Sequence, residues 1–223
     1  MFRFALPRVL AVLCLILAVS AAPAHARDWE ITVHSTNQEQ MQSDVSSRMR
    51  GGLLPVGLSF IKGSPTILYI RDTILNPTAW LLEPYASTKD LEKGLNDMGT
   101  LGYRPTGLSY TGGRYFVFYI KDDIPYASWA VIPSELSLEG LKQAIKPYVS
   151  KGFIPYGLGS NNSQFLVLLL ETNLPHATSY MLESYPLDED KASPFIDQRV
   201  AQGYKPWGFL HHGSQVFLLY LKY

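Results

Sequence analysis

The sequence predicts an α+β fold built from four tandem β-α-β-β repeats, and three observations support this prediction. A heptapeptide of the form Gly-x-x-Pro-x-Gly-[Leu/Phe] occurs four times, with its first glycines 50, 50 and 51 residues apart. An aromatic residue stands 22 or 23 residues before each of these glycines, and a strongly apolar segment follows each heptapeptide. Such a fixed period is typical of repeat architectures. The first glycines are Gly52, Gly102, Gly152 and Gly203, and the aromatic residues are Trp29, Trp80, Trp129 and Tyr180.

The aromatic residue opens the first two elements of each repeat. It begins a short apolar or alternating segment, as in residues 80–83, which is typical of a strand. Apolar residues then recur 11, 7 and 3 positions before the heptapeptide glycine, and in the first repeat they are Met41, Val45 and Met49. This spacing predicts an amphipathic helix with one buried stripe. The glycine follows the stripe directly, where a helix C-terminus prefers glycine.

The heptapeptide begins the second strand, and a third strand completes the repeat. The heptapeptide proline lacks an N–H, so the second strand is expected at a sheet edge or with a bulge near the second glycine. After a turn rich in Gly, Asn, Ser and His comes a segment that is apolar on both faces, as in residues 116–120. A strand without alternation is covered on both sides. The third strand is therefore expected between the other two, in the order 1-3-2.

The repeats are expected to pack into one closed domain, residues 27–223. Mostly antiparallel sheets would face inward with the helices outside, because the apolar sheet faces have only one another as cover. An open solenoid is the weaker alternative. The heptapeptide proline and second glycine, such as Pro105 and Gly107, are expected to act through backbone geometry, with a positive φ as one possible reason for the glycine. The four repeats span about residues 28–75, 76–125, 126–175 and 176–223.

The repeats also differ in an alternating A-B-A-B pattern. Arg104 and Lys205 in repeats two and four replace the apolar Leu54 and Ile154 of repeats one and three. Repeats two and four also share a Leu-Glu-x-Tyr sequence on the first strand. The pattern predicts a pseudo-twofold relation between the two halves of the chain, with a seam near residues 122–126.

The repeat resembles bacterial tandem-repeat modules of uncharacterised function, which have a period near 50 residues. The likeness consists of the opening aromatic, the helix, the Gly-[Tyr/Phe]-x-Pro motif, the Gly/Asn turn and the Tyr/Phe-rich strand. Those modules occur in exported proteins, sometimes beside a hydrolase domain. The resemblance covers all four repeats and implies a fold and an exported setting. It transfers no activity, because its motif consists of turn and packing residues.

Residues 1–26 predict a cleaved export signal. Arg3 and Arg8 precede an apolar run at residues 9–19, and Ala24-His25-Ala26 has the form of a cleavage site. The run is shorter than the roughly 20 residues that cross a bilayer, so no membrane insertion is expected after cleavage. The predicted location is the periplasm, or outside the cell. The single cysteine, Cys14, lies inside the signal, so the remaining chain has to be stable without disulfides.

Charge argues against two classes of partner. Without residues 1–26 the chain keeps 17 basic residues against 19 acidic ones, and it has no run of lysine or arginine. Binding to nucleic acid needs a patch that neutralises phosphates, so a nucleic-acid partner is not expected. An anionic membrane surface is disfavoured for the same reason.

Catalytic and metal sites have little support in the sequence. His211 and His212 are adjacent at a predicted hairpin, but a metal site needs three or four ligands, and exposed turn histidines are the simpler interpretation. Glu83 and Glu183 form the one carboxylate pair related by the repeat symmetry, and they could serve as acid and base if the fold brought them together. The alternative is that each lies at a strand end, paired with Arg104 or Lys205. We expect no catalytic residues, no metal and no cofactor.

Binding residues are sought where the repeats differ. Trp207 and Tyr156 occupy a position that is Val or Thr elsewhere, and they are either exposed binding residues or core. The hairpins around Tyr110 and around His211 are the least alike and carry aromatic and basic groups. The predicted binding residues are Trp207, His211, His212, Tyr110 and Arg114.

Three classes of function follow, in order of preference. The first is a non-catalytic periplasmic protein that binds another protein, for instance an inhibitor or immunity protein against a secreted toxin or hydrolase. The second is a glycan- or lipid-binding module that stacks its ligand on aromatic side chains. The third is a hydrolase that uses Glu83 and Glu183.

Overall fold

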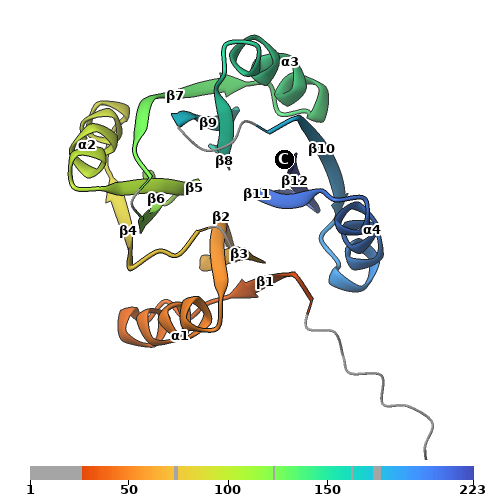
Figure 1. The fold of residues 1–223 in the computed structure, drawn as a ribbon, viewed down its shortest axis with the longest axis horizontal. Helices are drawn as coiled ribbons and strands as arrows, with labels where there is room; N and C mark the ends of the chain where they lie inside the picture. The colour runs from red at the N-terminus through yellow and green to blue at the C-terminus, as the bar shows by residue number, and fades with distance from the viewer. Residues whose placement is uncertain (1–26, 73–74, 123, 162, 173–176) are drawn as a thin grey trace, which may run out of the picture.

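The computed structural model of this chain describes residues 27–72, 75–122, 124–161, 163–172 and 177–223. The predicted export signal, residues 1–26, lies outside the described residues. The described part forms four β-α-β-β units arranged in a ring (Figure 1), as the repeats predict. Among its helices, none is long and apolar enough to span a membrane.

Each unit contributes three strands and one helix. The first unit contains β1 (Trp29–Val33), α1 (Gln38–Arg50), β2 (Leu53–Ile61) and β3 (Ser64–Arg71). The second contains β4 (Ala79–Tyr85), α2 (Thr88–Thr100), β5 (Tyr103–Thr111) and β6 (Arg114–Lys121). The third contains β7 (Tyr126–Ser134), α3 (Leu138–Val149), β8 (Ile154–Ser160) and β9 (Phe165–Thr172). The fourth contains β10 (Ser179–Pro186), α4 (Glu189–Ala201), β11 (Lys205–His212) and β12 (Gln215–Lys222).

Every unit has the predicted strand order, with its third strand in the middle. The four sheets have the orders β1-β3-β2, β4-β6-β5, β7-β9-β8 and β10-β12-β11. The central strand pairs antiparallel with both neighbours, as Phe118 does with Leu82 and Gly107. Val117 and Phe118, on opposite faces of the central strand β6, are both buried. This burial explains why the third segment of each repeat is apolar without alternation.

Local sequence signals set the ends of the helices. Each helix begins after an Asn, Ser or Asp whose side chain accepts a hydrogen bond from a backbone N–H in the first turn, which satisfies an otherwise unpaired donor. Each helix ends just before the first glycine of the heptapeptide. These glycines have φ values of 83° (Gly52), 79° (Gly102), 91° (Gly152) and 84° (Gly203). A side chain is strained in that conformation, so glycine is needed there to reverse the chain into the next strand.

The heptapeptide proline is accommodated as predicted, in an edge strand that carries a bulge. The register between β5 and β6 shifts between Pro105 and Gly107, and the other three units show the same shift. The bulge removes the need for a ladder hydrogen bond from proline.

The bulged strands line the centre of the ring. In Figure 1 the strands β2, β5, β8 and β11 point toward the middle and the helices form the periphery. Each bulged strand contacts the next, and β11 returns to β2, so the ring is closed. This arrangement agrees with the predicted inward packing of the sheets and differs from an open solenoid.

The second heptapeptide glycine is required by this packing, and a positive φ is not the reason. A Cβ atom on Gly107 would lie 2.8 Å from both the Cβ and the backbone N of Leu58 in the preceding unit. The contact recurs around the ring, from Gly157 to Leu108, from Gly208 to Leu158 and from Gly57 to Phe209. The residue after the second glycine thus packs on the glycine of the next unit. The last of these contacts closes the ring between the fourth unit and the first.

The opening aromatic residues join neighbouring units at the periphery. The indole Nε1 of Trp80 donates to Ser46 of α1 over 3.1 Å, and that of Trp129 donates to Asn96 of α2 over 2.9 Å. Trp29 donates in the same way to Asp197 of α4 over 2.8 Å. Each indole therefore ties its strand to the helix of the preceding unit.

Candidate functional sites

Four of the predicted binding residues lie in two hairpins. Tyr110 is half-buried and packs on Tyr115 with ring centroids 4.9 Å apart, while the neighbouring Arg114 is exposed. His211 and His212 are half-buried at the β11–β12 hairpin. The His211 backbone N–H donates to Ser59 of the first unit over 3.1 Å, and the His212 ring packs edge-to-face on Phe165. The two hairpins belong to the second and fourth units, which lie opposite each other in the ring (Figure 1).

Trp207 does not belong to this surface. Its side chain is 1% exposed, and its ring meets Tyr156 edge-to-face with centroids 5.4 Å apart. Val56, Thr106 and Tyr156 occupy the same position in the other units and are also fully buried. The interpretation of Trp207 and Tyr156 as exposed binding residues is therefore wrong, and they are core residues. Four residues of extended strand, about 13 Å, separate Trp207 from His211.

Glu83 and Glu183 are not brought together. They lie on β4 and β10, on opposite sides of the ring (Figure 1), and they line different pockets. Glu183 pairs with Arg199 of α4 in the same unit, Nη2 to Oε1 over 2.5 Å, and also accepts from Tyr185. The Arg199 hydrogen bonds lower the pKa of Glu183 and hold it as a carboxylate. In the second unit Met98 replaces Arg199, and Glu83 has no ion-pair partner among the described residues.

The expected pairing of these glutamates with Arg104 and Lys205 is also wrong. Arg104 donates from Nε and Nη2 to Asp122, and the Lys205 Nζ lies 2.7 Å from Asp72 Oδ2. The reason is the direction of the bulged strand, which carries both basic side chains to the centre of the ring. The glutamates stand on the outer strands, beyond the reach of these side chains.

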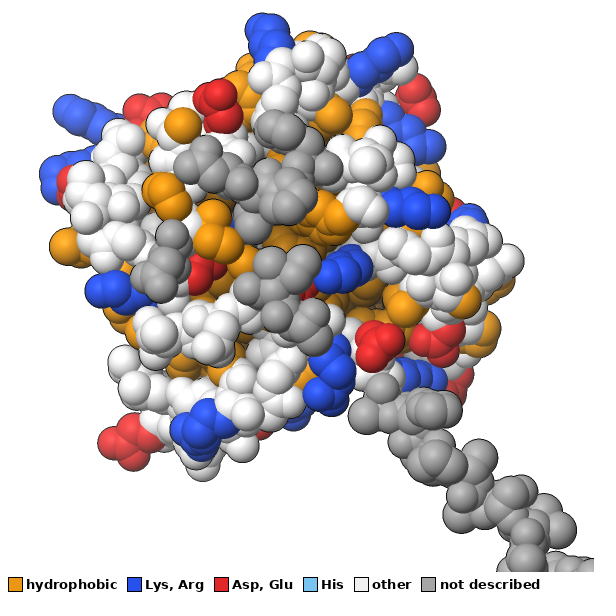
Figure 2. Space-filling view, in the orientation of Figure 1, with side chains coloured by type: hydrophobic (Ala, Val, Ile, Leu, Met, Phe, Trp, Pro, Cys, Tyr) orange, Lys and Arg blue, Asp and Glu red, His pale blue; other side chains and the backbone are white. Residues whose placement is uncertain are grey.

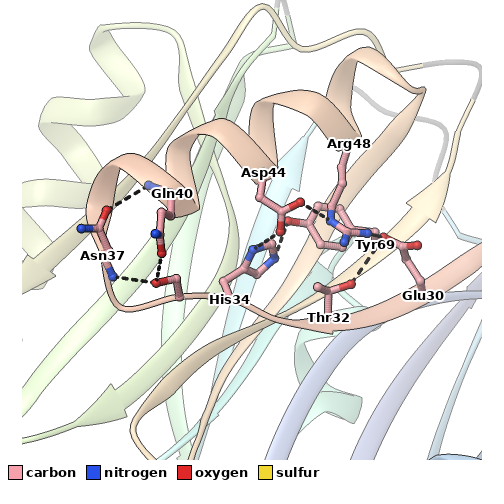
Figure 3. Close-up of polar contacts among 9 residues, drawn as sticks. Glu30, Thr32, His34, Asn37, Gln40, Asp44, Arg48 and Tyr69 are labelled. Carbon is pink, nitrogen blue, oxygen red and sulfur yellow. Dashed lines mark hydrogen bonds and ion pairs between the residues drawn. The ribbon is translucent and has the colours of Figure 1, made fainter.

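A polar network links α1 to the sheet of the first unit (Figure 3). The Tyr69 hydroxyl lies 2.8 Å from His34 Nε2, and His34 Nδ1 lies 2.9 Å from Asp44 Oδ2. Arg48 extends the network by contacting both Asp44 and Glu30. The order carboxylate, imidazole, hydroxyl has the form of a nucleophilic triad.

Burial and repetition argue that this network is structural. His34 is 3% exposed and Tyr69 is fully buried, so no substrate reaches the hydroxyl. Burial also raises the pKa of Tyr69 well above its ordinary value, which disfavours the phenolate that would act as a nucleophile. In the second and fourth units a tyrosine replaces His34 and contacts the tyrosine that is equivalent to Tyr69. Their hydroxyl pairs are Tyr85 with Tyr119 at 3.0 Å and Tyr185 with Tyr220 at 2.9 Å.

A second polar group, the axial cluster, lies at the centre of the ring. We define it as Arg104, Asp122, Tyr156, Lys205 and Trp207, with Asp72 and Tyr223 beside it. The Arg104 guanidinium lies 5.0 Å from the centroid of the Tyr156 ring, and the Trp207 ring packs against both Tyr156 and Tyr223. The cluster thus joins side chains from three units with the end of the chain.

Two buried donors of the axial cluster, Arg104 Nη1 and Trp207 Nε1, have no hydrogen-bond partner among the described residues. Burial raises the pKa of Tyr156 to about 12, although the Arg104 charge and a hydrogen bond with Thr172 oppose this, so the phenol keeps its proton. A buried ion pair such as Arg104–Asp122 contributes little net stability, since desolvation offsets the attraction. These features make the cluster a candidate site.

Pockets lie between each helix and the first strand of the next unit. One of about 570 Å³ separates α1 from β4 and is walled by Phe60, Trp80, Phe116 and Glu83. Another, of about 710 Å³, separates α3 from β10 and is lined by Lys142 and Lys146. Figure 2 views the ring along its axis, with hydrophobic side chains in the middle of this face and most charged side chains around its edge.

Within the described ranges, no group of three His, Cys, Asp or Glu side chains is placed to hold a metal ion. No protein-family model matches this sequence, and the search of curated proteins found no match either. The chemistry of the sites is therefore the ground on which function is inferred.

The axial cluster could have been found from the sequence, because two of its charged residues stand at apolar positions of the repeat. Arg104 and Lys205 replace Leu54 and Ile154, and a repeat position that is apolar in two units is a core position. A charged residue at such a position needs a buried partner. The partners Asp122 and Asp72 both follow the third strand directly, where the chain returns to the same end of the sheet.

Proposed function

We propose that this protein is a non-catalytic binding protein that acts in the periplasm after export and that its partner is another protein. The observation that carries the proposal is that recurring and variable residues occupy different parts of each repeat. Recurring residues are occupied by scaffold contacts, as Gly107 is against Leu58 and Trp129 is against Asn96. The hairpins, in contrast, present different side chains in each unit.

The hairpin with Tyr110 and Arg114 is the preferred contact surface. Tyrosine and arginine are enriched among residues that dominate protein interfaces, because they combine a large contact area with hydrogen bonding. Arg114 is exposed and makes no ion pair within the described residues. His211 and His212 present a second hairpin on the opposite unit. A rigid closed scaffold with variable hairpins suits an inhibitor or immunity protein directed at a secreted toxin or hydrolase.

A glycan- or lipid-binding function is the second candidate. It is favoured by one observation, the pocket of about 570 Å³ whose wall includes Phe60, Trp80 and Phe116. Aromatic side chains of this kind stack on sugar rings or pack on acyl chains. The hydrolase alternative has no such support, because Glu83 and Glu183 line separate pockets.

The test begins with affinity capture from the periplasmic fraction and culture medium of the source cells. The captured partner is then purified and titrated by calorimetry against wild type, Arg114→Ala and Tyr110→Ala, with Lys142→Ala on α3 as the matched surface control. We expect at least about a tenfold loss of affinity in one or both hairpin variants, because truncating an important interface residue costs about 2 kcal/mol.

The control distinguishes the two outer surfaces. Wild-type affinity in both hairpin variants, with a loss in Lys142→Ala, would place the contact on the helices. Binding of oligosaccharide or detergent that is lost in Trp80→Ala, with no protein partner captured, would favour the second candidate. Trp207→Ala is unsuitable, because truncating a side chain that is 1% exposed perturbs the core.

A further inference from the structure

The first position of the apolar helix stripe differs in the fourth unit. The other three units have Met41, Leu91 and Leu141 there, and all three side chains are buried. The fourth unit has Ala192. Its helix α4 lies next to β1 of the first unit, where the ring closes (Figure 1). This junction therefore lacks the carbon atoms that a larger side chain provides at the same position elsewhere.

An apolar pocket of about 170 Å³, the closure pocket, lies at this junction. We define it by Trp29, Ile31, Ala192, Ile196, Phe209 and Leu218, which line it. Except for the partly buried Ile31, these residues belong to the buried core. A cavity of about 150 Å³ with an apolar lining stays free of water and binds benzene. The closure pocket thus has the size and lining for one apolar group.

The corresponding pocket between α1 and β4 does not reach the core. Met41 lines that pocket, whereas its deeper neighbours do not. Those neighbours are Val45, Leu58 and Ile67, the repeat equivalents of Ile196, Phe209 and Leu218. The exchange of methionine for alanine therefore accounts for the depth of the closure pocket.

The uncharged polar side chains in the wall of the closure pocket already have partners. The Thr66 hydroxyl donates to a backbone carbonyl over 3.3 Å, and Ser193 accepts from Arg27 over 3.3 Å. The Tyr185 hydroxyl lies 2.9 Å from that of Tyr220. Because these groups are satisfied, the wall favours an occupant that needs no hydrogen bond.

Exposed apolar side chains surround the mouth of the closure pocket. Val33 and Leu187 line the pocket and are 60% and 40% exposed. Phe195, one turn along α4 from Ala192, is 55% exposed and stacks on Tyr185. Apolar side chains gathered at one place on a surface mark an interaction site. A small free molecule in the pocket would leave them in water, whereas a protein chain would cover them.

The charged residues at the mouth favour a basic neighbour for the occupant. Asp188 and Glu189 line the pocket, and its described lining contains no lysine or arginine. Asp188 pairs with Lys191. Glu189 is 74% exposed and lies 3.6 Å from Arg27, and such an exposed pair contributes little. Glu189 is therefore available to a basic residue of a partner.

We propose that the closure pocket receives one apolar side chain of the partner protein, about as large as phenylalanine, which stands next to a basic residue. The inference rests on the proposed function and adds an anchor point to it. The pocket lies beside the hairpin that carries His211 and His212, because the Leu187 N–H donates to the Ser214 carbonyl of that hairpin over 2.9 Å. Side chains that fill such pockets dominate the affinity of protein interfaces.

The decisive variant is Ala192→Met, which restores the side chain of the first unit. The matched control is Ala201→Met, which adds the same side chain at the exposed last residue of α4. Benzene probes the pocket without a partner. It should raise the melting temperature of wild type and Ala201→Met in a saturable way, but not that of Ala192→Met. Without benzene, Ala192→Met should be at least as stable as wild type, because methionine fills the pocket.

The partner obtained by affinity capture is then titrated by calorimetry against the same proteins. Ala192→Met should weaken binding at least about tenfold, and Ala201→Met should leave it unchanged. Glu189→Gln should make binding less dependent on salt, because it removes the charge that faces the basic residue. An unchanged salt dependence would refute the basic neighbour.

Four results would overturn the closure pocket as an anchor site. Wild type that shows no saturable response to benzene has no open pocket, and an Ala192→Met protein that melts below wild type has no room for a side chain. Equal partner affinity in wild type and Ala192→Met would overturn this inference and leave the proposed function intact. Binding of dodecyl maltoside that is lost in Ala192→Met, with no protein captured, would identify an alkyl chain as the occupant and overturn both.

Discussion

Replacing Gly107 by alanine should destabilise the ring through one steric contact. The added methyl carbon would lie 2.8 Å from the Cβ and the backbone N of Leu58, and 3.2 Å from the carbonyl carbon of Gly57. Two of these three atoms are backbone, so a side-chain rotation cannot relieve the clash. The units would have to separate by several tenths of an ångström at the most tightly packed part of the interface.

The size of the effect follows from the cost of overpacking. Extra methylene groups in a well-packed core cost about 1–3 kcal/mol, and the backbone contact places Gly107→Ala at the upper end. For a chain of this size, 1 kcal/mol corresponds to about 2–4 °C in melting temperature. We therefore expect a loss of about 6–12 °C. Gly208→Ala should be milder, because its closest contact, at 3.3 Å, includes the movable Leu158 side chain.

Thermal unfolding of the two variants followed by circular dichroism tests this ranking. Both substitutions add the same methyl group at the same position of the repeat, so differences in helix or strand propensity cancel. A Gly107→Ala protein as stable as wild type, or one more stable than Gly208→Ala, would refute the steric explanation.

Two further predictions concern buried charge. Asp122→Asn should lower the unfolding free energy by about 3 kcal/mol, because it leaves the buried Arg104 charge without a counterion. Urea denaturation measures this loss. The control is Asp97→Asn, which removes an exposed ion pair with Lys93 and should change the unfolding free energy little. Burial lowers the pKa of His34, although Asp44 opposes it, so below about pH 6.5 the unfolded chain binds the proton more tightly and stability falls. His34→Gln should therefore lose less melting temperature than wild type between about pH 7.5 and 5, and an equal loss in both would exclude His34 as the cause.

Most of the fold is predictable because the same local signals occur four times. A stripe such as Met41 and Val45, a glycine at the helix end and a doubly apolar third strand each report on local structure, and repetition removes ambiguity. The strand order follows from the apolarity of the third strand. The closed ring also follows from the need to cover the sheet faces.

The reason for the second glycine is not predictable in the same way. A single sequence shows that Gly107 recurs, and both a positive φ and a close approach explain a recurring glycine. The approach to Leu58 depends on how two units meet, which no local signal records. Contacts between units are therefore harder to predict from the sequence than the structure within one unit.

The candidate sites were harder to predict for a related reason. Trp207 and His211 are four residues apart in the chain, yet one is core and the other lies at a hairpin. The direction of the strand along the ring axis decides this difference, and the repeat pattern does not contain it. The repeat pattern likewise offers a glutamate as one possible partner of Arg104, whereas the fold pairs it with Asp122.

The closing contacts between the first and fourth units set the order of events when the chain is made. Trp29 meets Asp197, 168 residues later, and Gly57 meets Phe209. One flank of the first unit therefore stays uncovered until the final repeat has been synthesised. Until then its inner strand β2 leaves apolar side chains and the surface of Gly57 uncovered. A chain truncated before the fourth repeat would keep that flank open permanently, and two such chains could cover each other's open flanks, so truncation should produce an oligomer rather than a smaller stable monomer.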